Sequence, residues 1–184
     1  DSLTCISAFA RLPSQLATAL NPAVGYWDPM GLADADFWSM GNDATWGFLR
    51  QAEIKHGRVA MFAFCGYIAQ ANGVHFPYVQ GAITSGATPE EQWFNLPVEG
   101  RAQIIGFIGF LEFWGELQKP HYMSGGKPGN FKLLWDPVGF TAAMPEAELK
   151  VRRQRELNNG RLAMIGVMGF SAAALVPGSV PLLP

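Results

Sequence analysis

Residues 53–67 read Glu53-Ile-Lys-His-Gly-Arg-Val-Ala-Met-Phe-Ala-Phe-Cys-Gly-Tyr67, and residues 156–170 repeat them as Glu156-Leu-Asn-Asn-Gly-Arg-Leu-Ala-Met-Ile-Gly-Val-Met-Gly-Phe170. Six of the fifteen positions are identical, and most of the others are apolar in both copies. A Trp-Asp-Pro-x-Gly sequence precedes each copy, in residues 25–32 and 133–140. Self-similarity at a fixed offset, here 103 residues, indicates that the two segments share one structure.

Around the repeat, the chain predicts three long helices, at about 43–72, 98–118 and 145–175. The first has no charged residue between Val59 and Phe76, and the second has AQIIGFIGFL at its centre. Pro145, with Glu146 and Glu148 in the next turn, predicts the start of the third, because acidic side chains stabilise the positive end of the helix dipole. We therefore expect an all-α fold in a single domain spanning residues 1–184.

Composition and charge favour membrane-spanning helices over a soluble helical bundle. The chain is 49% hydrophobic and 15% charged, against about 25% charged in a typical soluble domain. A membrane span needs roughly 20 mostly apolar residues. Each predicted helix comes near this length only when a few charged residues within it are tolerated, so hydropathy alone leaves the soluble alternative open. Twelve of the thirteen Lys and Arg residues lie on one side of the three helices or in the helix ends facing it, Arg101 being the exception. This is the positive-inside pattern of membrane proteins.

Three spans would place the two copies of the repeat in parallel helices, related by a pseudo-two-fold axis along the membrane normal. Arg58 lies five residues after Glu53, about 140° around the helix, and Arg161 is placed in the same way after Glu156. Such side chains pair poorly within one helix, and unpaired charges at membrane depth are costly. We therefore expect crossed ion pairs, Glu53 with Arg161 and Glu156 with Arg58.

Small residues in the repeat would let the two helices approach each other closely; these are Gly57, Gly160, Ala60 and Ala163. The crossed pairing leaves each glutamate with a second carboxylate oxygen. His56 and Asn159 offer a neutral donor on the same helix faces. Single donors a turn apart, in apolar surroundings, suit flat metallated rings that need one further ligand better than a bare metal ion.

These features resemble a known family. EIKHGRVAM and ELNNGRLAM, with the Trp-Asp-Pro-x-Gly turns before them, resemble the chlorophyll-binding repeats of the light-harvesting complex superfamily, over about residues 25–170. RAQIIGFIGFLEFWGE and PHYMSGGKPG are most similar to the red-lineage chlorophyll a/c branch. That branch includes fucoxanthin-chlorophyll proteins and membrane peridinin-chlorophyll proteins.

The resemblance implies functional residues in this chain. The chlorophyll magnesium ligands would be Glu53, His56, Gln103, Glu112, Glu156 and Asn159. Arg58 and Arg161 would be the structural ion-pair partners, and the end rings of two carotenoids would lie near Asp28 and Asp136. Gln103 could instead form a hydrogen bond between helices, and Glu112 could pair with Lys119.

The resemblance also implies a role and a location. The cofactors would be chlorophyll a, chlorophyll c and carotenoids. The carotenoids would be peridinin or fucoxanthin, together with a carotenoid of the diadinoxanthin type. The protein would pass excitation energy to a photosystem core and would contact neighbouring antenna subunits and thylakoid lipids. It would lie in the chloroplast thylakoid membrane with its N-terminus in the stroma.

Two other functions remain open at this point. A photoprotective quencher would use the same ligands. Glu53-x-x-His56 also fits the Glu-x-x-His element of di-iron carboxylate enzymes, although the second copy has Asn159 and each motif carries an arginine that would repel a metal cluster. We therefore expect no enzyme activity. The net charge of −2 leaves no basic excess for a nucleic acid partner.

Overall fold

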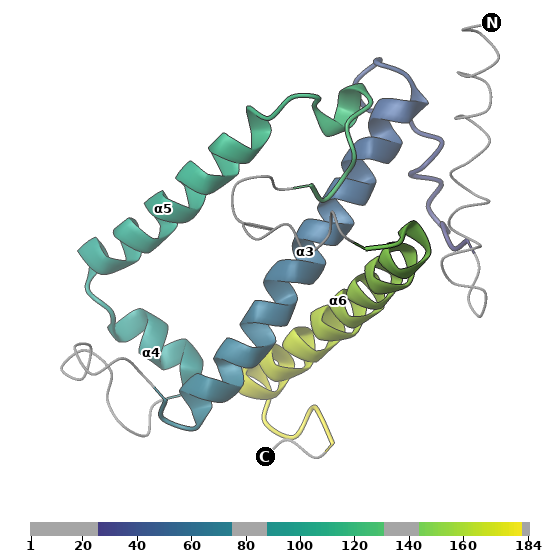
Figure 1. Ribbon diagram of the computed structural model, residues 1–184. Coiled ribbons are helices and arrows are strands. Elements are labelled where there is room, and N and C mark those ends of the chain that lie inside the picture. Colours follow the sequence, from purple (N-terminus) through teal and green to yellow (C-terminus); the bar gives the residue numbers. More distant parts are fainter. Residues whose placement is uncertain (1–25, 75–87, 131–143, 182–184) are drawn as a thin grey trace, which may run out of the picture. The chain divides into compact units, whose positions relative to one another are not determined.

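The computed structural model describes residues 26–74, 88–130 and 144–181 (Figure 1). These residues form helices joined by turns, and no strand occurs among them. The elements in chain order are α3 (Asn42–Ala71), α4 (Pro89–Asn95), α5 (Val98–Glu116), the 3-10 helix η2 (Tyr122–Ser124) and α6 (Glu146–Leu175). The predicted all-α class is confirmed.

The ends of the long helices lie within two residues of the predicted positions. The sequence pattern favoured 43–72, 98–118 and 145–175, whereas α5 already ends at Glu116. Pro145 was predicted to be the first residue of the third helix, but α6 begins one residue later, at Glu146. The carbonyl oxygen of Pro145 accepts a hydrogen bond from the N–H of Leu149 at 3.1 Å. Helix α4 was not predicted from the sequence, although a capping box between Thr88 and Glu91 marks its start.

No helix among the described residues is both long enough and apolar enough to cross a membrane.

The chain divides into two compact units. Unit 1 comprises Asp1–Lys55 and Lys119–Glu156, and unit 2 comprises His56–Gln118 and Leu157–Pro184. Each unit thus includes part of α3 and part of α6. The prediction of one domain over residues 1–184 stays a prediction.

In unit 1, the segment after α5 packs on the beginning of α3. The carbonyl oxygen of Tyr122 lies so close to Gly47 that a side chain there would collide with it. Further along the segment, the backbone N–H of Gly129 donates to the Gln51 side-chain oxygen at 2.6 Å. These contacts hold η2 and the glycine-rich turn after it against α3.

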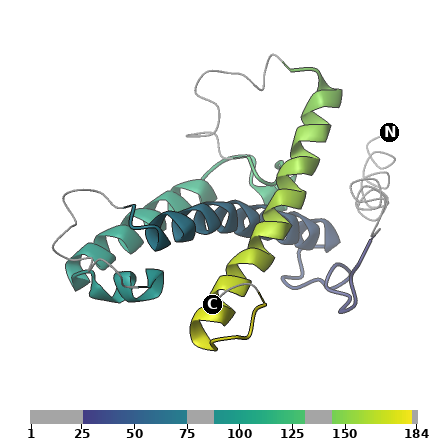
Figure 2. The same cartoon turned by 90° about the horizontal axis from the view of Figure 1, so that it is seen from below.

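In unit 2, α3 and α6 cross (Figure 2). A Cβ atom added to Gly57 would lie 3.1 Å from the Cα of Gly160. Beyond the crossing, the Phe170 ring stacks on Tyr67 at a centroid distance of 4.6 Å. Gly57 and Gly160 occupy equivalent positions of the repeat, so their mutual contact agrees with the predicted two-fold relation. The close approach that the small residues predicted is confirmed at this pair.

Very few apolar side chains are buried among the described residues. The buried hydrophobic residues are Ala33, Ala44 and Ala60. Helix α5 contains no buried residue, and aromatic and branched side chains are exposed along it, including Phe107 at 64%. Exposed apolar surface of this extent marks a protein that is covered by lipid, ligand or a partner.

Candidate functional site

In unit 1, Glu53 has an ion-pair partner that the sequence analysis missed. Its Oε2 lies 2.8 Å from Nη1 of Arg50, and the two side chains are 26% and 31% exposed. Residues three apart share a helix face, so the spacing itself was the missed signal. Arg50 places positive charge beside the Glu53 carboxylate and holds it on the helix surface.

In unit 2, His56 and Asn159 lie at equivalent positions next to the helix crossing. Both are exposed, whereas Gly57 and Gly160, each one residue further along, are buried. Adjacent helical residues point about 100° apart. A glycine packed in the crossing therefore turns the preceding His or Asn outward, as a ligand for a group on the helix surface requires.

The other charged residues at positions that carry the same charge in both copies are half-buried. Arg58 and Arg161 belong to unit 2, and Glu156 belongs to unit 1. Each of the three interacts with other residues of the protein. The crossed pairs Glu53–Arg161 and Glu156–Arg58 stay a prediction.

The two candidate residues of α5 are separated along the helix. Gln103 and Glu112 are both exposed and nine residues apart, which places them on opposite faces. Ile104 and Ile108, both exposed apolar side chains, lie on α5 between them. The two polar residues could therefore not act on one shared ligand, but each could serve a separate one.

Asp28 organises the turn before α3. Its carboxylate accepts the backbone N–H groups of Ala33 at 2.9 Å and Leu32 at 3.1 Å, and the Tyr26 hydroxyl donates to it at 3.0 Å. These hydrogen bonds stabilise the ionised carboxylate and lower the pKa of Asp28 below its ordinary value. The bond from the Ala33 N–H has the largest effect, and the bonds from the Leu32 N–H and the Tyr26 hydroxyl add to it. The equivalent residue, Asp136, lies outside the described residues.

The described residues contain no group of three or more His, Cys, Asp or Glu side chains that could hold a metal ion. What the repeat and α5 present are single oxygen or nitrogen donors on helix surfaces. This donor set suits a ring whose metal already has four ligands and needs one more. The fold and these donors define a helical protein of the cofactor-binding class.

The comparisons with known proteins agree with that class. The family model for chlorophyll A-B binding proteins matches residues 12–175. The fucoxanthin-chlorophyll a-c binding protein of Trieres chinensis is 33% identical, over 96% of this chain and 93% of that protein. The fucoxanthin-chlorophyll a-c binding protein D of Macrocystis pyrifera is 34% identical, over 87% of this chain and 86% of that protein. The fucoxanthin-chlorophyll a-c binding protein F of Phaeodactylum tricornutum is 35% identical, over 81% of this chain and 73% of that protein.

The chain belongs to the chlorophyll A-B binding protein family. It is a light-harvesting antenna protein, as the sequence analysis expected, and not an enzyme. The di-iron alternative is therefore wrong.

Proposed function

We propose that this chain is a thylakoid antenna subunit of the chlorophyll a/c type, which collects light and passes excitation energy to a photosystem. The observation that carries the proposal is the outward-facing apolar surface of the described helices, on which single polar donors are spaced. Water would solvate such a surface poorly, whereas chlorophyll and carotenoid molecules would cover it. When bound, the pigments supply the absorption and the excited states.

Six residues would supply the donors to chlorophyll magnesium: Glu53, His56, Gln103, Glu112, Glu156 and Asn159. The exposure of His56, Asn159, Gln103 and Glu112 supports this assignment, because a ring needs free surface around its ligand. Magnesium favours oxygen and other hard donors, and all six side chains offer an oxygen or an imidazole nitrogen. Gln103 and Glu112, on opposite faces of α5, would hold separate pigments.

Arg58 and Arg161 would neutralise the glutamates and leave one carboxylate oxygen of each for magnesium. A carboxylate with a cationic partner stays ionised in an apolar surround, whereas an isolated one takes up a proton. The contact between Gly57 and Gly160 supports the crossed pairing, because it brings equivalent parts of the two copies together.

The three long helices α3, α5 and α6 would cross the thylakoid membrane. Because no helix in the described part of the chain is apolar enough alone, this topology requires the crossed ion pairs and the pigments to neutralise and cover the polar positions. The distribution of Lys and Arg supports a stromal N-terminus and a lumenal connection between α3 and α5.

The carotenoids would lie along the crossed helices, with their end rings near the Asp28 and Asp136 turns. The names of the relatives favour fucoxanthin over peridinin as the main carotenoid, and a diadinoxanthin-type carotenoid would accompany it. Photosystem cores, neighbouring antenna subunits and thylakoid lipids would be the partners.

Purification of the chain from thylakoids in mild detergent tests this function. We expect a coloured protein whose absorption spectrum and extracted pigments show chlorophyll a, chlorophyll c and carotenoid. A long excited-state lifetime in the isolated protein would support harvesting, and a strongly shortened one would support quenching. A colourless protein would overturn the proposal.

A further inference from the structure

An arginine lies three positions before the first glutamate of each copy of the repeat. Arg50-Gln51 precedes Glu53, and Arg153-Gln154 precedes Glu156, at the same offset of 103 residues. Residues three apart share a helix face, so each arginine can reach the glutamate that follows it. All of these residues belong to unit 1, so the two positions can be compared directly.

The two arginines differ in the structure. Nη1 of Arg50 donates a hydrogen bond to Oε2 of Glu53 at 2.8 Å, and both side chains are half-buried. Arg153 is exposed, and within the described residues it forms no ion pair. Glu53 therefore has a cationic partner on its own helix, whereas the corresponding arginine of α6 does not pair with Glu156.

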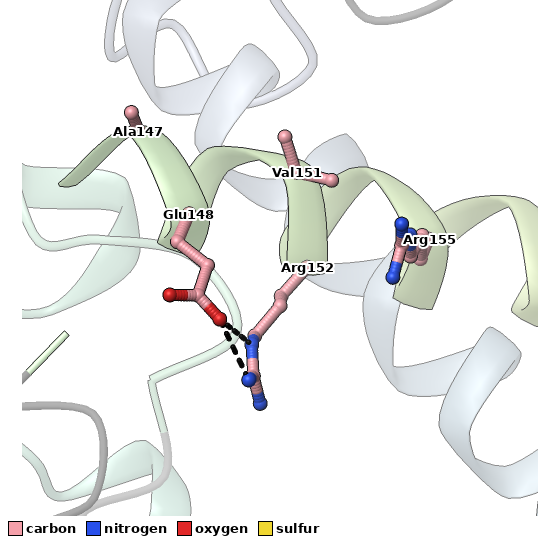
Figure 3. A pocket seen from close by; sticks show the side chains of 5 residues that line it. All are labelled: Ala147, Glu148, Val151, Arg152 and Arg155. Atoms are coloured by element: carbon pink, nitrogen blue, oxygen red, sulfur yellow. Dashed lines mark hydrogen bonds and ion pairs between the residues drawn. The ribbon is translucent and has the colours of Figure 1, made fainter. Parts of the chain in front are cut away.

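The other ion pairs at the start of α6 do not involve Glu156 either. Figure 3 shows the side chains of Arg152 and Glu148 directed toward each other, with Nη2 of Arg152 2.7 Å from Oε1 of Glu148. Lys150 pairs with Glu146 at 3.7 Å. In the part of the chain that the structure describes, none of the four Lys and Arg residues between positions 150 and 155 therefore pairs with Glu156.

The packing of α3 accounts for this difference. The carbonyl oxygen of Tyr122 lies against Gly47, about one turn before Arg50, where a side chain would collide with it. The corresponding residue of α6 is Lys150, whose side chain excludes such a contact. The segment after α5 therefore covers α3 next to Arg50, which is only 31% exposed, and limits the directions in which this arginine can point.

We propose that Arg50 is a positioning residue for the chlorophyll on Glu53, so that the two chlorophyll sites of the repeat depend unequally on the crossed arginines. This inference rests on the proposed ligand role of the glutamates and on the proposed crossed ion pairs. Arg50 holds one carboxylate oxygen by a charge-assisted hydrogen bond, which is strongest in apolar surroundings. When Arg161 is removed, Glu53 keeps this second cation, whereas Glu156 has no second cation among residues 150–155 when Arg58 is removed.

Reconstitution of the full chain with pigments, followed by pigment counting, tests the proposal. Arg58→Leu should lose the chlorophyll on Glu156, and Arg161→Leu should lose less of the chlorophyll on Glu53. Arg50→Gln combined with Arg161→Leu should lose this chlorophyll, with a loss greater than the sum of the two single losses, because both cations act on one carboxylate. Absorption difference spectra, compared with those of Glu53→Leu and Glu156→Leu, identify the chlorophyll that is lost.

Two further variants in the Arg161→Leu background are the controls. Arg50→Lys keeps the positive charge and should restore the chlorophyll on Glu53, which a role in packing alone would not predict. Arg153→Gln removes the same charge from the corresponding position of α6 and should behave as Arg161→Leu alone. If the double variant does not assemble, Arg50→Gln by itself provides the measurement. The absorption band of the Glu53 chlorophyll should then be lost at a lower temperature on heating, whereas Arg153→Gln should leave it as in wild type.

Three results would overturn the proposal: equal losses in Arg161→Leu and Arg58→Leu, a double variant no worse than Arg161→Leu, or no restoration by Arg50→Lys. Any of them in a protein whose wild-type form is coloured would refute this inference alone. A colourless wild-type protein would refute the antenna function.

Discussion

Gly160 and Gly57 meet backbone to backbone where α6 crosses α3. A Cβ atom on Gly160 would lie 2.9 Å from the Cα of Gly57, while one on Gly57 would lie 3.1 Å from the Cα of Gly160. Backbone atoms cannot move aside as a flexible side chain can. The crossing therefore requires glycine most strictly at position 160.

The first prediction is that Gly160→Ala weakens assembly more than Gly57→Ala does. Overpacking of a close contact costs about 1–3 kcal/mol, which should appear as a lower temperature of pigment loss on heating. Gly169→Ala, in the same helix with nothing within 4 Å of the added Cβ, is the matched control and should behave as wild type. Equal stability of all three variants would refute the requirement for a close crossing.

The second prediction separates the proposed ligands from their charge partners. His56→Leu should remove one chlorophyll and leave the fold, because the loss of a neutral ligand leaves no charge unpaired. Arg58→Leu should be far worse if Arg58 pairs with Glu156 as proposed, because breaking an ion pair that the pigments and lipid bury costs about 3–5 kcal/mol, and Glu156 would then take up a proton and lose strength as a ligand. Pigment counting after reconstitution measures both effects.

Reversal of the charges is the control for that experiment. Arg58→Glu combined with Glu156→Arg should recover part of the assembly yield while the pigment on Glu156 stays lost. Wild-type assembly of Arg58→Leu, or a double variant no better than the single ones, would exclude the crossed ion pairs.

The third prediction concerns the pH dependence of the turn that Asp28 organises. Because its pKa in the folded protein is lowered, ionised Asp28 stabilises the turn above the ordinary value of 3.8, and the stabilisation is lost as the pH falls below it. The protection of the Leu32 and Ala33 amides from hydrogen exchange, relative to the intrinsic exchange rate at each pH, should fall in that acidic range. In Asp28→Asn the exchange should already be fast at neutral pH, and slow exchange there would refute the role of the carboxylate.

The fourth prediction concerns topology. In sealed, stroma-side-out thylakoid vesicles, an added protease should cleave between Lys119 and Lys150 and leave the connection around Glu90 intact. The reason is the distribution of Lys and Arg, of which twelve of thirteen fall on the expected stromal side. Cleavage near Glu90 without opening the vesicles would contradict the proposed orientation.

The sequence alone determined the helical class, the positions of the three long helices and the doubled motif. Helix-forming runs, glycine- and proline-rich connections and an internal repeat are local properties, and they can be recognised without knowledge of packing. The capping box that begins α4 at Thr88 and the three-residue spacing of Arg50 and Glu53 were also present in the sequence, although the analysis missed both.

Only the tertiary structure decided which residues meet across long separations in the chain. Gly57 and Gly160 are 103 residues apart, and Gln51 and Gly129, which share a hydrogen bond of 2.6 Å, are 78 apart. Such contacts depend on how helices pack, since side chains distant in sequence come together only when the chain between them has folded. For the same reason, the sequence could only suggest that His56 and Asn159 point outward. The crossing of α3 and α6 decided it, because it buries the glycine next to each of these residues.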